Sequence, residues 1–267
     1  MRHFSIITLL TDFGHQDAYV GIMKGVIAGI NPCAHIIDIC HEIPPQDVFQ
    51  GAYLLYTSYK YFPKGTIHTA VVDPGVGGKR DIVCVKIRDY FFLVPNNGIL
   101  SFILQEEAPE EIVRITNTTY FLRKPSRTFH GRDVFAPVAA YVSCGIKPQQ
   151  LGTHIQQLNK LDIPEPTRTK MEHIIGQIIS IDRFGNLITN ITKKHIWDLK
   201  TAGKHLEVTL GKRKITGLSN TYVDGKTGKP LILFGSAGFL EVSVNQGNAQ
   251  KYFKAGRGSK ITASPDK

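Results

Sequence analysis

Three short segments of this sequence combine charged side chains with turn-forming residues, and each lies beside an apolar run. They are TDFGHQD from residue 11, HTAVVDPGVGGKR from residue 68 and TFHGRDVFAP from residue 128. The last two contain Asp73, Arg80 and His130, which together supply an acid, a base and a cation. If they converge in the fold, such a set can orient a water molecule and remove a proton from it.

The glycine-rich segment around Asp73 resembles a phosphate-binding loop only superficially. A Walker loop requires G-x-x-x-x-G-K, and counting back from Gly78 and Lys79 places Asp73 at the first glycine. A dinucleotide loop starting at Gly75 meets Arg80 where the third glycine should be. An aspartate at a strand end would repel a phosphate, whereas it suits hydroxyl groups, a cation or an activated water. An ordinary turn begun by Asp-Pro is an equal alternative.

The other two segments also have simple structural readings. Asp12 directly follows the first apolar run, where it either turns the chain toward a helix or faces a ligand. A lone histidine such as His130 is more often structural than catalytic, and Asp133 at a helix start fits an N-cap. The triplet DFG at residues 12–14 matches a kinase motif, but the HRD segment of kinases is absent from the sequence, so this match is chance.

These segments depend on alternating strands and helices for their positions. The apolar run 4–10 predicts a strand buried on both faces, and apolar positions three and four apart predict a helix over 17–30, ending at Asn31-Pro32. The same criteria predict further strands at 35–40, 66–73, 82–87 and 90–95, and helices at 48–62, after residue 98 and at 134–144. The order strand, helix, strand, helix, strand over residues 4–73 predicts a parallel α/β sheet.

After residue 150 the pattern changes to short strands. The segment 158–170 contains two prolines and mixed charges, as linkers do. Six short strands follow in about 75 residues and predict a small antiparallel barrel or sandwich. We therefore expect an α/β domain at 1–157, a linker at 158–170, a β-barrel domain at 171–255 and a solvated basic tail at 256–267.

The second half also has polar residues beside tight glycine turns. They fit a small-molecule pocket, although Gly185 and Gly235 fit ordinary hairpin turns equally well. The residues are Asp182, Asn186, Ser236 and Glu241.

Composition narrows the class of protein. With 267 residues and 42% hydrophobic content, the chain can bury one large or two smaller cores. The net charge is +10, but the 32 lysines and arginines are scattered along the sequence, so nucleic-acid binding is not expected. The four cysteines lack CxxC spacing, which favours reduced, buried thiols over a zinc site or disulfides. No cleavable leader or membrane span is expected, and the predicted location is the cytoplasm.

Taken together, the motifs resemble the S-adenosyl-L-methionine (SAM) hydroxide adenosyltransferases, the SAM hydrolase family related to fluorinase and chlorinase. The shared segments are LLTDFG, VVDPGVGGKR, PNNGIL, TFHGRDVFAP, IDRFGNLITNI and GSAGFLEV, which span residues 9 to about 242. The resemblance implies a Rossmann-like α/β domain, a C-terminal β-barrel and a homotrimer with sites between subunits. It also implies cleavage of SAM at C5′ by water to adenosine and L-methionine, without a metal or cofactor.

The resemblance further assigns roles to residues of this chain. The catalytic set maps onto Asp73, Arg80 and His130, and Asp12 matches the aspartate that holds the ribose hydroxyls. Arg80 beside His130 is expected to keep the imidazole neutral and able to accept a proton, although which of the three takes it stays open. In the barrel, Asp182 and Ser236 match methionine contacts, Phe184 and Asn186 match adenine contacts, and Glu241 and Val244 lie on a strand bordering the ligand.

Two alternatives share this pocket. One is a chlorinase-like enzyme that transfers the adenosyl group to a halide. It is disfavoured because the chain keeps the Asp-Arg-His set and shows no obvious extra loop in its first half. The other is a sensor that binds SAM or adenosine with little turnover.

Overall fold

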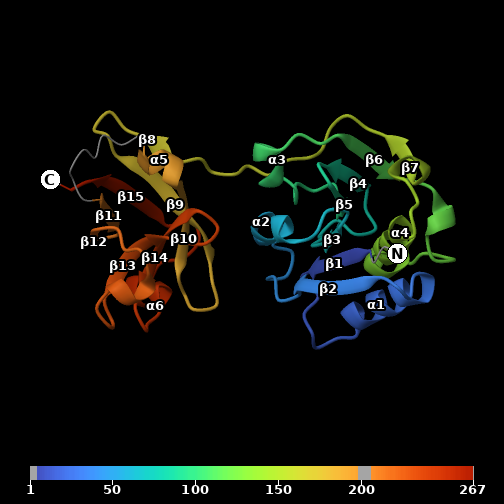
Figure 1. Ribbon diagram of the computed structural model, residues 1–267, viewed down its shortest axis with the longest axis horizontal. Helices are drawn as coiled ribbons and strands as arrows, with labels where there is room; N and C mark the ends of the chain where they lie inside the picture. The colour runs from blue at the N-terminus through green and yellow to red at the C-terminus, as the bar shows by residue number, and fades with distance from the viewer. Residues whose placement is uncertain (1–4, 198–205, 267) are drawn as a thin grey trace. The chain divides into compact units, whose positions relative to one another are not determined.

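The computed structural model describes residues 5–197 and 206–266. The chain divides into two compact units, Met1–Asp162 and Ile163–Lys267 (Figure 1). The division falls inside 158–170, the range predicted as a linker. Each unit has its own sheet and its own hydrophobic core.

The first unit is built on a mixed seven-stranded sheet with the order β2-β1-β3-β5-β4-β6-β7. Strands β2, β1, β3 and β5 run parallel, whereas β4, β6 and β7 pair antiparallel. The prediction of a parallel sheet, made from the first three strands, is confirmed for them, and the structure adds an antiparallel half that was not predicted. The strands are β1 Ile6–Thr11, β2 His35–Cys40, β3 Ile67–Val71, β4 Ile82–Ile87, β5 Tyr90–Pro95, β6 Glu111–Ile115 and β7 Gly152–His154.

The direction of the sheet reverses at a short hairpin between β4 and β5. Only Arg88 and Asp89 separate these strands, and Arg88 has a φ of 50°. A two-residue connection leaves no room for a crossover helix, so the two strands must pair antiparallel.

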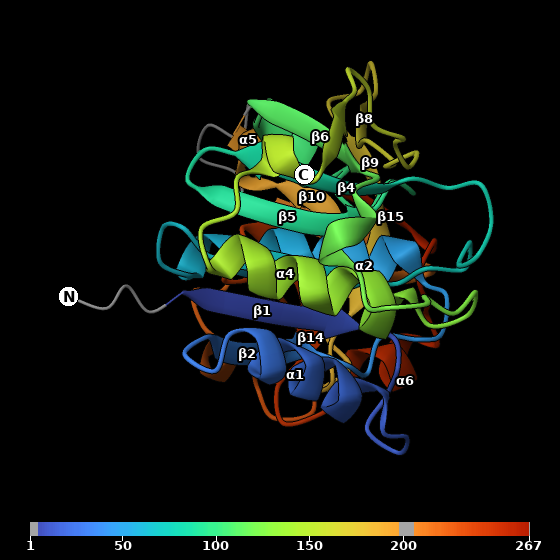
Figure 2. The ribbon, with the colours of Figure 1, turned by 90° about the vertical axis from the view of Figure 1, so that its right-hand side faces the viewer.

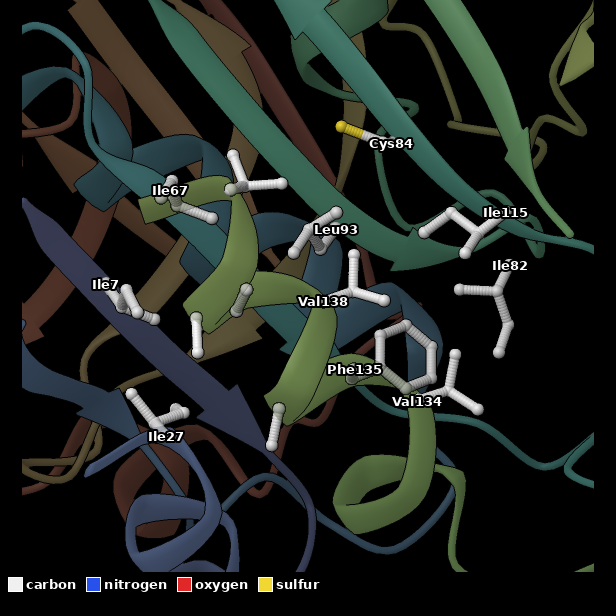
Figure 3. Close-up of a cluster of buried hydrophobic side chains, with 14 of the residues drawn as sticks. Ile7, Ile27, Ile67, Ile82, Cys84, Leu93, Ile115, Val134, Phe135 and Val138 are labelled. Carbon is white, nitrogen blue, oxygen red and sulfur yellow. The ribbon is translucent and has the colours of Figure 1, made fainter. Parts of the chain in front are cut away.

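Helices cover both faces of this sheet and make the unit Rossmann-like. Helices α1 (Tyr19–Ile30) and α4 (Ala136–Ser143) lie on one face and α2 (Val48–Ser58) on the other (Figure 2). The core on the first face joins β1 residue Ile7 with Ile27 of α1 and Val138 of α4 (Figure 3). The short helix α3 spans Ile103–Glu106. No helix among the described residues has both the length and the apolar character needed to cross a membrane.

The connections between strands change direction between β1 and β3. The chain runs from β1 to β2 on one side and then returns to β3 on the other side of β1. Ligands of such sheets bind where the connections diverge, at the carboxyl ends of the strands. Asp12 directly follows β1 and Asp73 lies two residues after β3. Both carboxylates therefore belong to this edge of the sheet.

The second unit is an antiparallel, nearly closed barrel. Its order is β12-β11-β15-β9-β10-β14-β13, with β8 paired to β9, and a bridge between Leu218 and Ile232 links the segment after β12 to β13. Two short helices, α5 (Lys193–Trp197) and α6 (Ala249–Phe253), accompany it. The strands are β8 Thr167–Arg168, β9 Ile174–Ile181, β10 Leu187–Thr192, β11 Leu206–Leu210, β12 Arg213–Thr216, β13 Pro230–Phe234, β14 Phe239–Val244 and β15 Lys260–Pro265.

Strand β15 corrects the prediction of a solvated basic tail over 256–267. It pairs with β9 on one side and β11 on the other. Ile261 and Ala263 are buried in the barrel core, whereas Lys260, the first residue of the strand, is exposed. The tail prediction is wrong for residues 260–265 because they form a strand whose apolar residues Ile261 and Ala263 face the barrel core.

The four cysteines are free thiols, as expected, but they differ in burial. Cys84 is buried and Cys40 is half-buried, whereas Cys33 and Cys144 are exposed. The prediction that these thiols are buried is therefore wrong for Cys33 and Cys144.

Candidate active site

Asp73, Arg80 and His130 lie in direct contact. The Nε of Arg80 donates to the carboxylate oxygens of Asp73 at 3.0 and 2.8 Å, and one terminal nitrogen donates to Oδ2 at 2.5 Å. The same nitrogen lies 2.8 Å from Nδ1 of His130. The side chains of Asp73 and Arg80 are 4% and 11% exposed. The three residues thus form one hydrogen-bonded chain with Arg80 in the middle.

A tight turn brings Asp73 and Arg80 together. The backbone N–H of Val76 donates to the carbonyl of Asp73 at 3.2 Å, which closes a β-turn. Gly77 has a φ of 75°, and a Cβ there would lie 2.3 Å from the carbonyl oxygen of Arg127. Only glycine fits this close approach. The turn reading of this segment is therefore correct for its backbone, and the same turn brings the two charged side chains into contact.

His130 precedes a π-helical turn, Gly131–Phe135, that leads into α4. The loop before it is anchored by Asp133, whose side chain is 2% exposed. Oδ2 of Asp133 accepts the backbone N–H of Ser126 at 2.7 Å, and Arg132 pairs with the same carboxylate at 2.6 Å. Asp133 therefore ties down the loop preceding His130, beyond the N-cap role that its position suggested.

The contact with Arg80 determines which nitrogen of His130 carries hydrogen. Burial and then the positive charge of Arg80 lower the pKa of His130, so the ring is neutral near pH 7. Because a guanidinium only donates, Nδ1 must accept, and the hydrogen of the neutral ring lies on Nε2. The ring is neutral as expected, but in this tautomer Nδ1 is occupied and Nε2 has no free lone pair. The geometry thus disfavours the expected role of His130 as proton acceptor.

A cavity of about 390 Å³ opens at this edge of the first unit. Asp12, Asp73 and His130 all line it, whereas Arg80 lies behind Asp73 and outside the lining. Oδ2 of Asp12 accepts the backbone N–H of Gln46 at 2.7 Å. Three of the residues expected to act on one substrate therefore share one cavity.

Three aromatic rings that were not among the predicted site residues form part of this cavity. Phe13, Tyr19 and Phe129 line it, with ring centroids 4.9 to 6.0 Å apart. Their planes meet at tilted or edge-on angles, which aromatic pairs prefer. Phe13 follows Asp12 and Phe129 precedes His130, so adjacency to predicted site residues is the signal that could have identified two of the three.

A second cavity, of about 470 Å³, lies in the barrel unit. Asp182, Phe184, Asn186 and Val244 line it. Oδ1 of Asp182 accepts the backbone N–H groups of Phe184 and Asn186 at 2.9 and 2.8 Å, and Oδ2 accepts the side-chain amide of Asn186 at 2.8 Å. Phe184 is 73% exposed and Asn186 is buried. The carboxylate of Asp182 therefore organises its own turn and holds an apolar ring out toward solvent.

Glu241 lies buried close to this cavity but is not part of its lining. The hydroxyl of Tyr222, which does line it, donates to Oε2 at 2.9 Å. A Cβ on Gly235 would lie 1.7 Å from Oε1, so glycine makes room for the carboxyl group. Burial, aided by the charge of Asp182, raises the pKa of Glu241, and burial raises the pKa of Tyr222 to about 12.

Two further outcomes concern the barrel unit. Ser236 is exposed and does not line the cavity. Tyr222 was missed because it opens a short 3-10 helix, Tyr222–Asp224, that was not predicted, and only the fold brings it to Glu241. Among the described residues, no group of three or more His, Cys, Asp or Glu side chains is arranged to hold a metal ion.

Comparisons with known proteins agree with this architecture. Residues 7–152 match the model for the SAM hydroxide adenosyltransferase N-terminal domain, and residues 176–262 match that for the C-terminal domain. The chain is 37% identical to a protein of Methanocaldococcus jannaschii named (R)-S-adenosyl-L-methionine hydrolase, over 92% of this chain and 90% of that protein. It is 26% identical to a fluorinase of Actinopolyspora mzabensis, over 97% of both.

A solved structure gives the same result for the fold. The crystal structure of an uncharacterized conserved protein from Thermotoga maritima superposes with a TM-score of 0.91 at 36% identity, covering 97% of this chain and 99% of that one. The similarity therefore extends over both units of the chain.

Proposed function

This chain belongs to the SAM hydroxide adenosyltransferase family, and we propose that it hydrolyses S-adenosyl-L-methionine at C5′ to adenosine and L-methionine. The observation that carries this proposal is the hydrogen-bonded chain of Asp73, Arg80 and His130 beside the cavity that Asp12 also lines. Relatives named as SAM hydrolases, at 31 to 37% identity over about nine-tenths of the chain, support it further.

The reaction is a displacement at a saturated carbon. The water oxygen bonds to C5′, the bond between C5′ and sulfur breaks, and its electron pair stays on the sulfur of methionine. One proton is released in balance. Because a sulfonium is a good leaving group, the enzyme mainly has to place the water in line and partly desolvate it. This scheme balances without a metal or cofactor, and we propose none.

Asp12 is proposed to hold the hydroxyls of the ribose. An ionised carboxylate offers about four acceptor positions, and the backbone N–H of Gln46 takes one of them. Each charge-assisted hydrogen bond to a ribose hydroxyl contributes about 1.5–3 kcal/mol. The negative charge also favours a substrate whose sulfonium is positive.

Asp73 is proposed to receive the proton. Arg80 is a donor only, and His130 in its tautomer has no free lone pair. Oδ1 of Asp73 accepts one hydrogen bond from Arg80, which leaves acceptor capacity on that oxygen. The attacking water becomes strongly acidic as it bonds to carbon, so a carboxylate is basic enough. His130 then orients Arg80, and Arg80 orients Asp73.

The barrel unit is proposed to recognise the two ends of the substrate. From the family resemblance, Asp182 and Ser236 contact the methionine part, Phe184 and Asn186 contact adenine, and Glu241 and Val244 border the ligand. Supporting this, Asp182, Phe184, Asn186 and Val244 line one cavity. The exposed ring of Phe184 offers a face on which a base can stack.

We also propose a homotrimer acting in the cytoplasm, which rests on the family resemblance and on the substrate class. Light scattering of the purified protein tests the assembly. A trimer has about three times the chain mass of 29.7 kDa, and a mass of one chain would exclude it.

Incubation with SAM in ¹⁸O-labelled water, followed by mass spectrometry of the products, tests the reaction. We expect adenosine labelled at the 5′-hydroxyl and an equal amount of unlabelled methionine. The control is heat-denatured enzyme, because SAM also decomposes without a catalyst. Formation of 5′-chloroadenosine in chloride buffer would instead show a halide-transferring enzyme. Tight adenosine binding without methionine release would show a sensor.

A further inference from the structure

A second chain of polar side chains lies beside Asp12 and takes no part in the proposed reaction. Nδ1 of His41 is 2.8 Å from Oγ1 of Thr11, and Nε2 of His41 is 3.1 Å from Oδ1 of Asp38. The ammonium of Lys24 lies 2.5 Å from Oδ2 of Asp38. Thr11 and His41 are 0% and 1% exposed. Polar side chains buried this deeply require an explanation.

The chemistry of the groups gives this chain a direction. The carboxylate of Asp38 is an acceptor 3.1 Å from Nε2 of His41, a contact too poorly aligned to be a hydrogen bond, and its negative charge favours the hydrogen of the neutral ring on Nε2. In this tautomer Nδ1 is the acceptor. The hydroxyl of Thr11 therefore donates to Nδ1. Its lone pairs stay available, and one accepts the backbone N–H of Phe13 at 3.2 Å. Burial lowers the pKa of His41 although Asp38 opposes it, which favours the neutral ring.

His41 holds the backbone on both sides of Asp12. Thr11, the residue before it, binds the ring of His41, and the N–H of Gly14 donates to the carbonyl of His41 at 2.8 Å. The carboxylate itself accepts the N–H of Gln46 from the same loop as His41. The end of β1 and the loop after it are thus joined to the loop after β2 at three places around Asp12, and His41 makes two of them, one through its ring and one through its backbone carbonyl.

We propose that His41 is a positioning residue for Asp12, and that it fixes the carboxylate in the orientation that the ribose hydroxyls require. This inference rests on the proposed function. His41 touches neither reacting atoms nor substrate in this scheme, so its influence on catalysis passes through the hydrogen bonds between Asp12 and ribose. A substrate that lacks one of those hydroxyls should therefore be less sensitive to a change at His41.

The chain contains a matched control for this test. His68 is also fully buried, and its Nδ1 lies 2.8 Å from the hydroxyl of Thr8, the same contact that His41 makes with Thr11. Thr8 and His68 lie opposite each other within the paired strands β1 and β3, away from the carboxyl ends that hold Asp12. Replacing His68 therefore removes a buried histidine–threonine contact that is distant from the loop of Asp12.

The experiment compares His41→Leu, His41→Asn and His68→Leu on SAM and on its 2′-deoxy analogue. For His41→Leu we expect KM for SAM to rise about tenfold, which corresponds to the loss of one charge-assisted hydrogen bond. We expect KM for the 2′-deoxy analogue to rise less than about threefold, because one of the hydroxyls that Asp12 binds is already missing. His41→Asn keeps an acceptor near the position of Nδ1 and should recover most of the loss. His68→Leu should change KM for both substrates by the same factor.

If His41→Leu raised KM by the same factor for SAM and for the 2′-deoxy analogue, the inference would be overturned, because equal factors indicate a merely structural role. Near-ultraviolet circular dichroism checks that each variant is folded. If His41→Leu does not fold, Asp38→Asn provides the same comparison at a partly exposed position. Its control is Glu110→Gln, which alters the partly exposed ion pair between Glu110 and Lys86. Wild-type protein that neither cleaves SAM nor binds adenosine in calorimetry would overturn the proposed function itself.

Discussion

The cavities of the two units are held together in different ways. In the first unit, Asp73, Arg80 and His130 bind one another across separations of seven and fifty residues. In the barrel, the carboxylate of Asp182 binds groups within four residues of itself. The first arrangement leaves charged groups coupled to one another, as proton transfer requires, and the second builds a rigid local turn. In the proposed function the reacting groups accordingly belong to the first unit, together with the ribose contact of Asp12, whereas the barrel supplies contacts to the two ends of the substrate.

The largest effect is expected for Asp73→Asn. This change keeps the shape of the side chain but removes the charge that Arg80 binds and the proposed proton acceptor. We expect kcat to fall by roughly 10²–10⁴-fold, the usual contribution of a positioned base, while SAM still binds. Steady-state adenosine formation and calorimetric SAM binding measure the two quantities. Near-wild-type turnover would remove the assigned role and the contrast between the units.

A smaller effect of the opposite kind is expected for Asp182→Ala in the barrel. The loss of the carboxylate removes three hydrogen bonds within the turn and any contact with the substrate. We expect KM for SAM to rise about tenfold to a hundredfold, and kcat to change much less. The comparison between reaction and recognition fails if kcat falls as far as it does in Asp73→Asn.

Variants of His130 sharpen the account of the first unit. The side-chain oxygen of asparagine can accept from Arg80 where Nδ1 of His130 does, whereas alanine cannot. If His130 orients Arg80, His130→Asn should be about tenfold more active than His130→Ala, the worth of one charge-assisted hydrogen bond. If His130 were the base, the two variants would be equally inactive. Initial rates of methionine release at saturating SAM distinguish these cases.

The smallest effect concerns the free energy of unfolding at acid pH. As the pH falls, a buried histidine should lower the stability of the first unit, and a buried glutamate should raise that of the barrel. Burial lowers the pKa of His68 to about 3, so its neutral form is favoured in the fold. Stability is lost as the pH falls below about 6.5, by up to about 1.4 kcal/mol per pH unit. Glu241 in the barrel has a raised pKa, so acid relieves its buried charge. Urea unfolding at pH 7 and pH 5 should show a weaker pH dependence in His68→Phe and a stronger one in Glu241→Gln.

Much of the first unit could be predicted because its helices and strands follow local hydrophobic patterns. The direction of β4 could not be predicted from its apolar run, because parallel and antiparallel buried strands look alike. The informative signal was the connection of Arg88 and Asp89, which is too short for a crossover. Strand β15 was missed for another reason. Its partners in β9 lie more than 80 residues earlier in the chain, and its apolar residues are few.

The candidate site shows the same limit. Residue types and strand ends identified Asp12, Asp73, Arg80 and His130 as candidates, but their convergence depends on packing between loops distant in sequence. The contact of Gly77 with Arg127 and the anchoring of Ser126 by Asp133 bring those loops together. The tautomer of His130 follows only from the direction of its hydrogen bond with Arg80. Residue types alone therefore indicated the participants, and geometry was needed to distinguish the proton acceptor.

The place of β15 between β9 and β11 has a consequence for synthesis on the ribosome. Every strand of the first unit has been made by residue 154, so that unit can fold while the barrel is still being translated. The barrel sheet, in contrast, remains interrupted until residues 260–265 emerge. Until then the facing edges of β9 and β11 lack their partner, and unpaired strand edges invite aggregation. Damage to these last residues should therefore reduce the yield of soluble protein before it affects catalysis.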